Sequence, residues 1–192
     1  MTEVGPKLAG AAQRLMAGAM AVRGPAPVHL WNPAYCGEID MRIAADGRWF
    51  YNGSPINRMA MVKLFATILR KDPERFVLVT PVERVGIIVD DAPFLAVDLA
   101  SEADPAGERL FVRTNLDEVV EISEKHPMRF ETDTTGGLKP YILIRGDLWA
   151  LATRALTHDL IARCREENGW FGLKSGTSFF AVAPAEAVAG QI

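Results

Sequence analysis

An internal repeat with a spacing of 95 residues, the interval from Phe76 to Phe171, is the feature of this sequence that most constrains its fold. When the chain is moved along itself by that interval without gaps, aromatic, aliphatic and charged residues coincide. The coinciding pairs are Phe76 and Phe171, Leu78 and Leu173, Arg70 and Arg165, and Phe65 and Leu160. Chance similarity between two amphipathic helices is the alternative explanation. The spacing predicts a duplicated domain in which each half contains strands, a helix and a hairpin.

The predicted fold class is α+β, with two similar modules that each consist of an antiparallel sheet and a packed helix. A chain of 192 residues is long enough for two small domains. The polar, turn-rich segment 101–108 is the predicted boundary. The predicted parts are an N-terminal helix and connector at 1–34, a first module at 35–100, a second module at 101–183 and a tail at 184–192.

A β-hairpin opens the first module. Residues 39–43 alternate apolar and charged side chains, which predicts a strand with Asp40 and Arg42 on its exposed face. The dipeptide Asp46-Gly47 is typical of a tight turn, and it precedes a second strand-like run. The later elements predicted for this module are a helix over 58–71, ended by Asp72-Pro73, and strands over 76–80, 85–89 and 94–99.

The second module is predicted to contain a long helix. Asp147 is a suitable N-cap, and apolar residues such as Leu148, Leu151 and Leu156 follow at helical spacing. Asn168-Gly169 is predicted to close this helix. The predicted strands of this module are 109–114, 128–132, 141–145, 170–174 and 178–182, and an alanine-rich helix is predicted over 6–22.

Charge and composition exclude several classes of protein. With 21 basic and 24 acidic residues, the net charge of −3 does not favour non-specific nucleic-acid binding. No apolar run is long enough for a signal peptide or a bilayer span, so we expect a cytoplasmic protein. Cys36 and Cys164 lack the spacing of a zinc site and are predicted to be reduced, mostly buried thiols.

The sequence contains no complete catalytic motif. His29, His126 and His158 are isolated from one another, and no H-E-x-x-H pattern occurs. The nucleophile-elbow, P-loop and dinucleotide-binding patterns are also missing from the sequence. We therefore expect no metal and no cofactor, and binding is favoured over catalysis.

Cationic residues in predicted rigid elements are the positive signal. Arg42, Arg113 and Arg145 lie in predicted strands beside apolar residues, where a guanidinium needs a carboxylate or an anionic ligand. An internal salt bridge, for example to Asp40, Glu83 or Asp98, is the alternative. Other candidates for an anion site are the cations Arg58, Lys63 and Lys139, the hydrogen-bonding residues Thr80, Thr114 and Asn115, and the aromatic residues Trp49, Phe50 and Tyr141.

Several uncommon motifs occur in a fixed order between residues 35 and 182. These are G-E-I-D-M-R-I-A-A-D-G-R-W-F-Y-N-G-S-P-I, V-K-L-F-A-T-I-L-R, V-L-V-T-P-V-E, D-D-A-P-F and F-V-R-T-N. In these motifs the chain resembles an uncharacterised bacterial family of domains of unknown function, number twelve eighty-five in its series. The resemblance implies a domain duplication whose C-terminal half is similar to a pleckstrin-homology fold. Two predicted strands after the last long helix depart from that pattern.

The resemblance also implies a nucleotide-like ligand at the domain interface and a role in signalling. Carried onto this sequence, the interface candidates are Asp40, Arg42, Arg58, Lys63, Thr80, Glu83, Arg113, Asn115 and Arg145. No catalytic residue is implied.

Three functions are consistent with these observations. The first is a non-enzymatic binding protein for an anionic small molecule such as a nucleotide, held in a cleft between the modules, with a role in bacterial signalling. The second is a hydrolase acting on a nucleotide or ester, with Asp40 or Glu83 as general base. The third is an adaptor that binds a protein partner.

Overall fold

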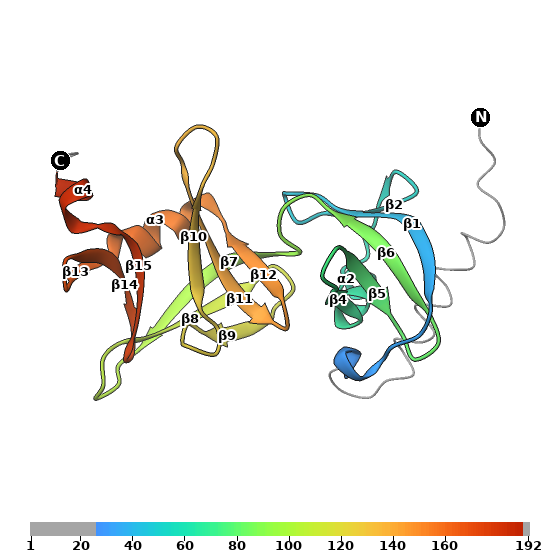
Figure 1. The fold of residues 1–192 in the computed structure, drawn as a ribbon, viewed down its shortest axis with the longest axis horizontal. Helices are drawn as coiled ribbons and strands as arrows, with labels where there is room; N and C mark the ends of the chain where they lie inside the picture. Colours follow the sequence, from blue (N-terminus) through green and yellow to red (C-terminus); the bar gives the residue numbers. More distant parts are fainter. Residues whose placement is uncertain (1–25, 190–192) are drawn as a thin grey trace. The chain divides into compact units, whose positions relative to one another are not determined.

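The computed structural model describes residues 26–189, so the helix predicted over 6–22 lies outside the described residues. The chain divides into two compact units between Asp91 and Ala92. In Figure 1 the first unit is coloured blue to green and the second yellow-green to red. Each unit has its own sheet and its own packed helix, and each is described by itself below.

Within residues 26–91, one six-stranded sheet has the order β3-β2-β1-β6-β5-β4. A short 3-10 helix, η1, precedes it at Val28–Leu30. The strands are β1 (Tyr35–Ile43), β2 (Trp49–Tyr51), β3 (Ser54–Pro55), β4 (Leu69–Lys71), β5 (Phe76–Val79) and β6 (Arg84–Val89). Neighbouring strands are antiparallel except for β1 and β6, which are parallel.

The predicted β1–β2 hairpin is confirmed. Met41 and Ile43 are fully buried, while Asp40 and Arg42 between them are exposed. A second tight turn follows β2, in which Asn52 has a φ of 48° and Gly53 a φ of 72°. Asn-Gly tolerates these left-handed conformations, and the turn therefore leads directly into β3.

The helix of the first unit, α2, spans Met59–Thr67 and buries Val62, Phe65 and Ala66. Phe65 is fully buried and stacks on Trp49, with ring centroids 6.4 Å apart. Burial of a side chain of this size stabilises the fold by about 1.5–3 kcal/mol.

The prediction that this helix continues to residue 71 was wrong. Leu69 pairs with Leu78, and the backbone N of Val79 donates to Ile68 O, so the chain has already entered β4. Ile68 and Leu69 are buried, as they would also be on the apolar face of a longer helix. Helical spacing alone therefore did not distinguish a longer helix from a strand here.

Within residues 92–189, a second six-stranded sheet has the order β10-β11-β12-β7-β8-β9. Its strands are β7 (Phe94–Glu102), β8 (Arg109–Thr114), β9 (Val119–Glu121), β10 (Met128–Thr132), β11 (Leu138–Arg145) and β12 (Leu148–Ala152). A three-stranded antiparallel sheet follows, made of β13 (Arg165–Glu167), β14 (Trp170–Ser175) and β15 (Ser178–Pro184), and helix α4 (Ala185–Ala189) follows it. As in the first unit, the six-stranded sheet contains one parallel pair, β7 with β12.

The helix of the second unit, α3, spans Arg154–Ala162 and packs against β7, β11 and β12. The predicted start at Asp147 was wrong, because Leu148–Ala152 forms β12 with alternating burial. The N-cap is Thr153, whose side chain accepts a hydrogen bond from Leu156 N. Asn168 and Gly169 do not end this helix either. Both have positive φ and form the tight turn between β13 and β14.

The predicted duplication agrees with the element positions. Moving α2 by 95 residues gives the bounds of α3, and β4, β5 and β6 move onto β13, β14 and β15 to within a few residues. The predicted boundary at residue 101 is not where the structure divides the chain. Segment 101–108 is the end of a hairpin, because Glu102 of β7 pairs with Arg109 of β8 inside the second unit.

Candidate functional site

A pocket of about 320 Å³ opens on the first unit. Its walls come from the start of β1, the turn between β4 and β5, and the start of β6. The lining residues are Tyr35, Asp72, Pro73, Glu74, Arg75 and Arg84. Pockets for small molecules usually enclose about 300–1,000 Å³, so this one suits a small ligand.

Strand pairing brings these residues together. The parallel register of β1 and β6 places Tyr35 beside Arg84. The turn after β4 is closed by two backbone hydrogen bonds, from Asp72 N to Arg75 O at 2.9 Å and from Arg75 N to Asp72 O at 3.3 Å. Pro73 lies in this turn, where its fixed φ is favourable. The pocket is therefore built on regular strands and one short turn.

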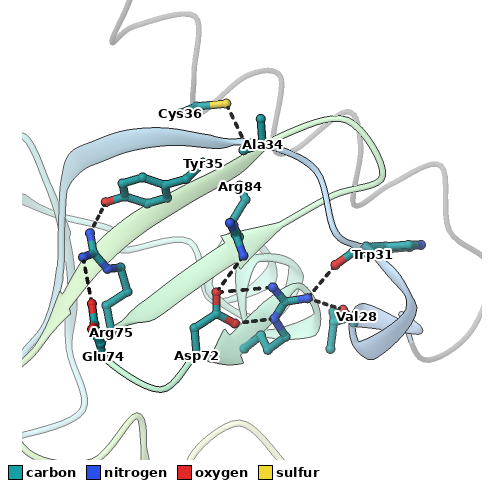
Figure 2. Close-up of polar contacts among 10 residues, drawn as sticks. Val28, Trp31, Ala34, Tyr35, Cys36, Asp72, Glu74, Arg75 and Arg84 are labelled. Atoms are coloured by element: carbon teal, nitrogen blue, oxygen red, sulfur yellow. Dashed lines mark hydrogen bonds and ion pairs between the residues drawn. The ribbon is translucent and has the colours of Figure 1, made fainter.

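Asp72 is shared by two arginines, as Figure 2 shows for Arg84. Arg70 donates from Nε to Oδ1 at 2.7 Å, and Arg84 donates from Nη1 to Oδ2 at 3.2 Å. Arg70 also donates from Nη1 to the carbonyl oxygens of Val28 and Trp31, at 2.7 and 2.6 Å. Arg70 therefore fixes the segment before β1 in place.

Tyr35 lies between two guanidinium groups (Figure 2). Its hydroxyl accepts a hydrogen bond from Arg75 Nη1 at 2.8 Å, and this bond raises the pKa of Arg75. The guanidinium carbons of Arg75 and Arg84 lie 4.8 and 6.0 Å from the ring centroid. A Cβ at Gly86 would lie 2.6 Å from the Tyr35 hydroxyl oxygen, so glycine at that position leaves room for the ring.

Two arginines share one carboxylate in the least solvated part of this site, although only Arg84 of the two lines the pocket itself. The side chains of Arg70 and Arg84 are 18% and 24% exposed, and they share the carboxylate of Asp72, which is 19% exposed. The two glutamates near Arg75 are 71% and 83% exposed, so water screens their charge. This imbalance favours an anionic guest over a cationic one.

One hydrogen-bond donor of this cluster is unsatisfied. Among the residues that the structure describes, no acceptor is found for the buried Nε of Arg84. A buried donor without an acceptor costs about 1–3 kcal/mol, and such groups are uncommon outside functional or strained positions. An oxygen of a bound ligand could satisfy this donor after a small movement of the guanidinium.

Both units match a known family. Residues 26–92 match the domain described as "Domain of unknown function (DUF1285), N-terminal domain", and residues 93–182 match the "Protein of unknown function (DUF1285), C-terminal domain". The chain belongs to the DUF1285 family. The resemblance found in the sequence motifs is therefore confirmed.

Two solved structures are similar to this DUF1285 chain. A DUF1285 family protein from Silicibacter pomeroyi DSS-3 is 48% identical, with a TM-score of 0.84, and the match covers 91% of this chain and 97% of that one. A DUF1285 family protein from Shewanella baltica OS155 is 30% identical, with a TM-score of 0.52, and the match covers 64% of this chain and 90% of that one. No match to this chain was found among curated proteins.

In this DUF1285 protein the three strand arginines predicted as ligand contacts each have a carboxylate partner. Arg42 donates from Nε to Asp90 Oδ1 at 2.8 Å, and its side chain is 53% exposed. The hydrogen bond and charge of Arg42 hold the pKa of Asp90 below its usual range. The internal ion pair, left open as the alternative, accounts for this residue without a ligand.

Arg113 and Arg145 are paired within the second unit. Arg113 contacts Asp98 and Asp117, each at 3.2 Å, and these hydrogen bonds raise its pKa. Arg145 contacts Glu118 Oε2 at 3.0 Å. Its guanidinium carbon also lies 5.4 Å from the ring centroid of Phe94. A ligand-binding role for these arginines stays a prediction. A ligand at either position would have to compete with the carboxylates for the guanidinium group.

Two further predicted site residues close turns. Thr80 is 1% exposed, and its hydroxyl accepts a hydrogen bond from Glu83 N at 3.2 Å. Asn115 Oδ1 accepts from Leu95 N at 3.0 Å, and Asn115 N donates to Leu95 O. The other predicted site residues are Asp40, exposed on β1, Arg58, exposed just before α2, Lys63, half-buried on α2, and Glu83, half-buried just before β6. None of the nine predicted residues lines the pocket around Arg84.

Sequence reasoning missed Tyr35, Arg75 and Arg84. The run of charges in K-D-P-E-R at 71–75 was the available signal, but it was interpreted as the end of a helix. The approach of Tyr35 to Arg84 depends on the parallel pairing of β1 with β6, which sequence pattern does not specify.

Residues 26–189 contain neither a membrane-spanning helix nor a cluster of metal-ligating side chains. No helix there has the length and apolarity that a bilayer crossing requires. No group of three or more His, Cys, Asp and Glu side chains there is placed to hold a metal ion.

Proposed function

We propose that this DUF1285 protein is a non-enzymatic binding protein for a small anionic molecule, such as a phosphorylated metabolite or nucleotide. The proposed site is the pocket of the first unit. Arg75 and Arg84 bind the anion with charge-assisted hydrogen bonds, and the Tyr35 hydroxyl adds a neutral one. In keeping with the family resemblance, we place this binding in the cytoplasm and in a signalling role.

The observation that carries this proposal is the pocket wall formed by Arg75 and Arg84. The Asp72 carboxylate receives hydrogen bonds from two arginines, while Arg84 keeps an unsatisfied Nε and Arg75 faces exposed glutamates. A phosphate or carboxylate presents several acceptor oxygens to such a wall. Arg70 supports the site without contacting the ligand, because its Nη1 is used by two backbone carbonyls.

A thermal-shift screen of the full chain with phosphate, pyrophosphate and a nucleotide panel tests this proposal. A ligand present at about 100 times its dissociation constant stabilises the protein by about 2.7 kcal/mol. We expect Arg75→Ala and Tyr35→Phe to reduce that stabilisation. Arg48→Ala is the matched control, since Arg48 lies in the same unit, is 68% exposed and pairs with Asp46 outside the pocket.

Two results would reject the proposal. The first is that no anion in the panel stabilises the wild-type chain. The second is that Arg75→Ala retains the full ligand-induced shift. The alternative hydrolase has no support from this pocket, because neither Asp40 nor Glu83 lines it.

A further inference from the structure

A larger pocket, of about 510 Å³, opens on the second unit. Strands β11 and β12, helix α3 and the loop between β10 and β11 supply its walls. In Figure 1 this loop extends beyond the sheet. The lining residues are Asp133, Thr135, Gly137, Leu138, Lys139, Leu151, Ala152, Arg154, Thr157, His158 and Ile161. No residue of the first unit contributes to it.

One face of α3 is directed at this pocket. Arg154, Thr157, His158 and Ile161 follow one another at intervals of three, one and three residues, which places them on one stripe of a helix. The core-facing side of the same helix carries Leu156 and Leu160, both buried. The helix therefore has two separate faces, one packed in the core and one that lines the pocket.

The pocket lining combines cationic and apolar side chains. Lys139 on β11 and Arg154 on α3 bring positive charge from two different elements, and Lys139 Nζ also lies 5.4 Å from the ring centroid of Tyr141. Leu138, Leu151 and Ile161 supply the apolar lining. This composition differs from the small pocket of the first unit, whose lining residues are mainly charged.

The carboxylate in this lining, that of Asp133, is hydrogen-bonded to its own loop. Asp133 Oδ1 accepts hydrogen bonds from Thr135 N at 2.8 Å, Thr135 Oγ1 at 2.7 Å and Gly137 N at 2.8 Å. These bonds hold the pKa of Asp133 below its usual range, so the carboxylate stays ionised and bound to its own loop. A Cβ at Gly137 would lie 2.6 Å from Asp133 Oδ2, so a larger residue there would force the Asp133 carboxylate to move.

We propose that this pocket binds an amphiphilic anion, with a carboxylate head at Lys139 and Arg154 and an apolar body against Leu138, Leu151 and Ile161. Charge complementarity selects the head, and burial of apolar surface adds about 25 cal/mol per Å² of tail covered. This second site does not depend on the function proposed for the first unit, because the two pockets share no residue.

Isothermal titration calorimetry of the full chain with decanoate tests this second site. Decanoate carries both the charged head and the apolar body. Acetate carries only the head, and decanol carries only the body. We expect decanoate to bind the wild-type chain, and acetate and decanol to bind at least about tenfold more weakly.

Substitutions of the pocket-lining residues test where decanoate binds. We expect Arg154→Ala and Lys139→Ala each to weaken decanoate binding about tenfold. Ile161→Glu should abolish it, because a carboxylate would then face the carboxylate ligand and its tail. Arg165→Ala is the matched control, because Arg165 is an exposed arginine of the same unit outside the pocket. Arg75→Ala in the first unit should also leave decanoate binding unchanged.

Absence of decanoate binding to the wild-type chain would overturn this inference. Wild-type affinity in Arg154→Ala would overturn it as well. Arg154 is exposed, so its substitution should leave the fold intact, and a circular dichroism spectrum unchanged from wild type checks this. Equal binding of decanoate and decanol would show that charge has no part in the site.

Discussion

Helices α2 and α3 occupy equivalent places in the duplicated fold but use one of their faces differently. In α2, Val62 and Ala66 are buried in the core. The positions 95 residues later are Thr157 and Ile161, which line an open pocket in the second unit. A duplicated fold can therefore keep its buried helix positions while a neighbouring helix face lies outside the core.

The strands after each helix differ in the same way. Asp72 in the first unit is shared by two half-buried arginines. The residue 95 positions later is Glu167, which makes one ion pair with Lys174 across an exposed hairpin. The first unit therefore has a half-buried cluster of charged side chains beside a pocket. The second unit has an exposed ion pair at the equivalent position.

The largest expected effect concerns the equivalent buried residues of the two helices, Phe65 in α2 and Leu160 in α3. Phe65 is fully buried and Leu160 is 1% exposed. Phe65→Ala should cost about 3–5 kcal/mol of unfolding free energy and Leu160→Ala about 2–5 kcal/mol, because each leaves a cavity. Urea unfolding followed by circular dichroism measures both. A cost below about 1 kcal/mol at either position would show that the two helices are not anchored alike.

The acidic residues provide a second comparison. Asp72→Ala should cost about 1–3 kcal/mol, because it leaves the donors of Arg70 and Arg84 without their acceptor. Glu167→Ala should cost only about 0–1 kcal/mol, since its ion pair is exposed to water. Urea unfolding measures both losses of unfolding free energy. Equal losses would show that Asp72 contributes no more to stability than the exposed Glu167.

An exchange of residues between the helices tests the difference in their faces. Ala66→Ile should cost about 1–3 kcal/mol, because Ala66 is 3% exposed and a larger side chain there must displace closely packed neighbours. Ile161→Ala should cost less than about 1 kcal/mol, because Ile161 is 38% exposed. A larger loss for Ile161→Ala than for Ala66→Ile would mean that the pocket-lining face is part of the core.

The smallest expected effect concerns thiol reactivity. Cys164 takes the repeat position of the buried Leu69 and is half-buried, and burial raises the pKa of its thiol to about 11. Labelling with iodoacetamide at pH 8 should therefore be slow at Cys164 and should accelerate as the pH rises toward 11, because the thiolate is the reactive form.

Cys36 is the internal reference for this measurement. It lies exposed in β1, so the sequence prediction of two mostly buried thiols was wrong for it. Peptide mapping by mass spectrometry separates the two sites. Faster labelling of Cys164 than of Cys36 would contradict the burial of Cys164.

Local patterns predicted the fold better than they predicted the candidate site. The alternation around Asp40 and Arg42 specified β1 correctly, because side chains of a strand point to its two faces in turn. The segment Leu148–Ala152 was misassigned because its apolar residues fit a helical period as well as a strand period.

The candidate site depends on contacts that are distant in sequence. Tyr35 meets Arg84 through a parallel strand pair, and Arg70 reaches the carbonyl of Val28 across two elements. Such pairings are set by topology, which hydrophobic periodicity does not encode. Among the arginines that the sequence did single out, Arg113 has a partner four residues later, Asp117, whereas the carboxylate partners of Arg42 and Arg145 are distant in sequence as well.

Taken together, we propose that the two units use one duplicated fold for two separate anion sites. Amide chemical-shift mapping of the labelled full chain, titrated with pyrophosphate and then with decanoate, tests it most directly. We predict that pyrophosphate shifts amides around Tyr35, Arg75 and Arg84, and that decanoate shifts those around Lys139 and Arg154. Shifts from both probes in the same unit, or from neither probe in either pocket, would contradict the claim.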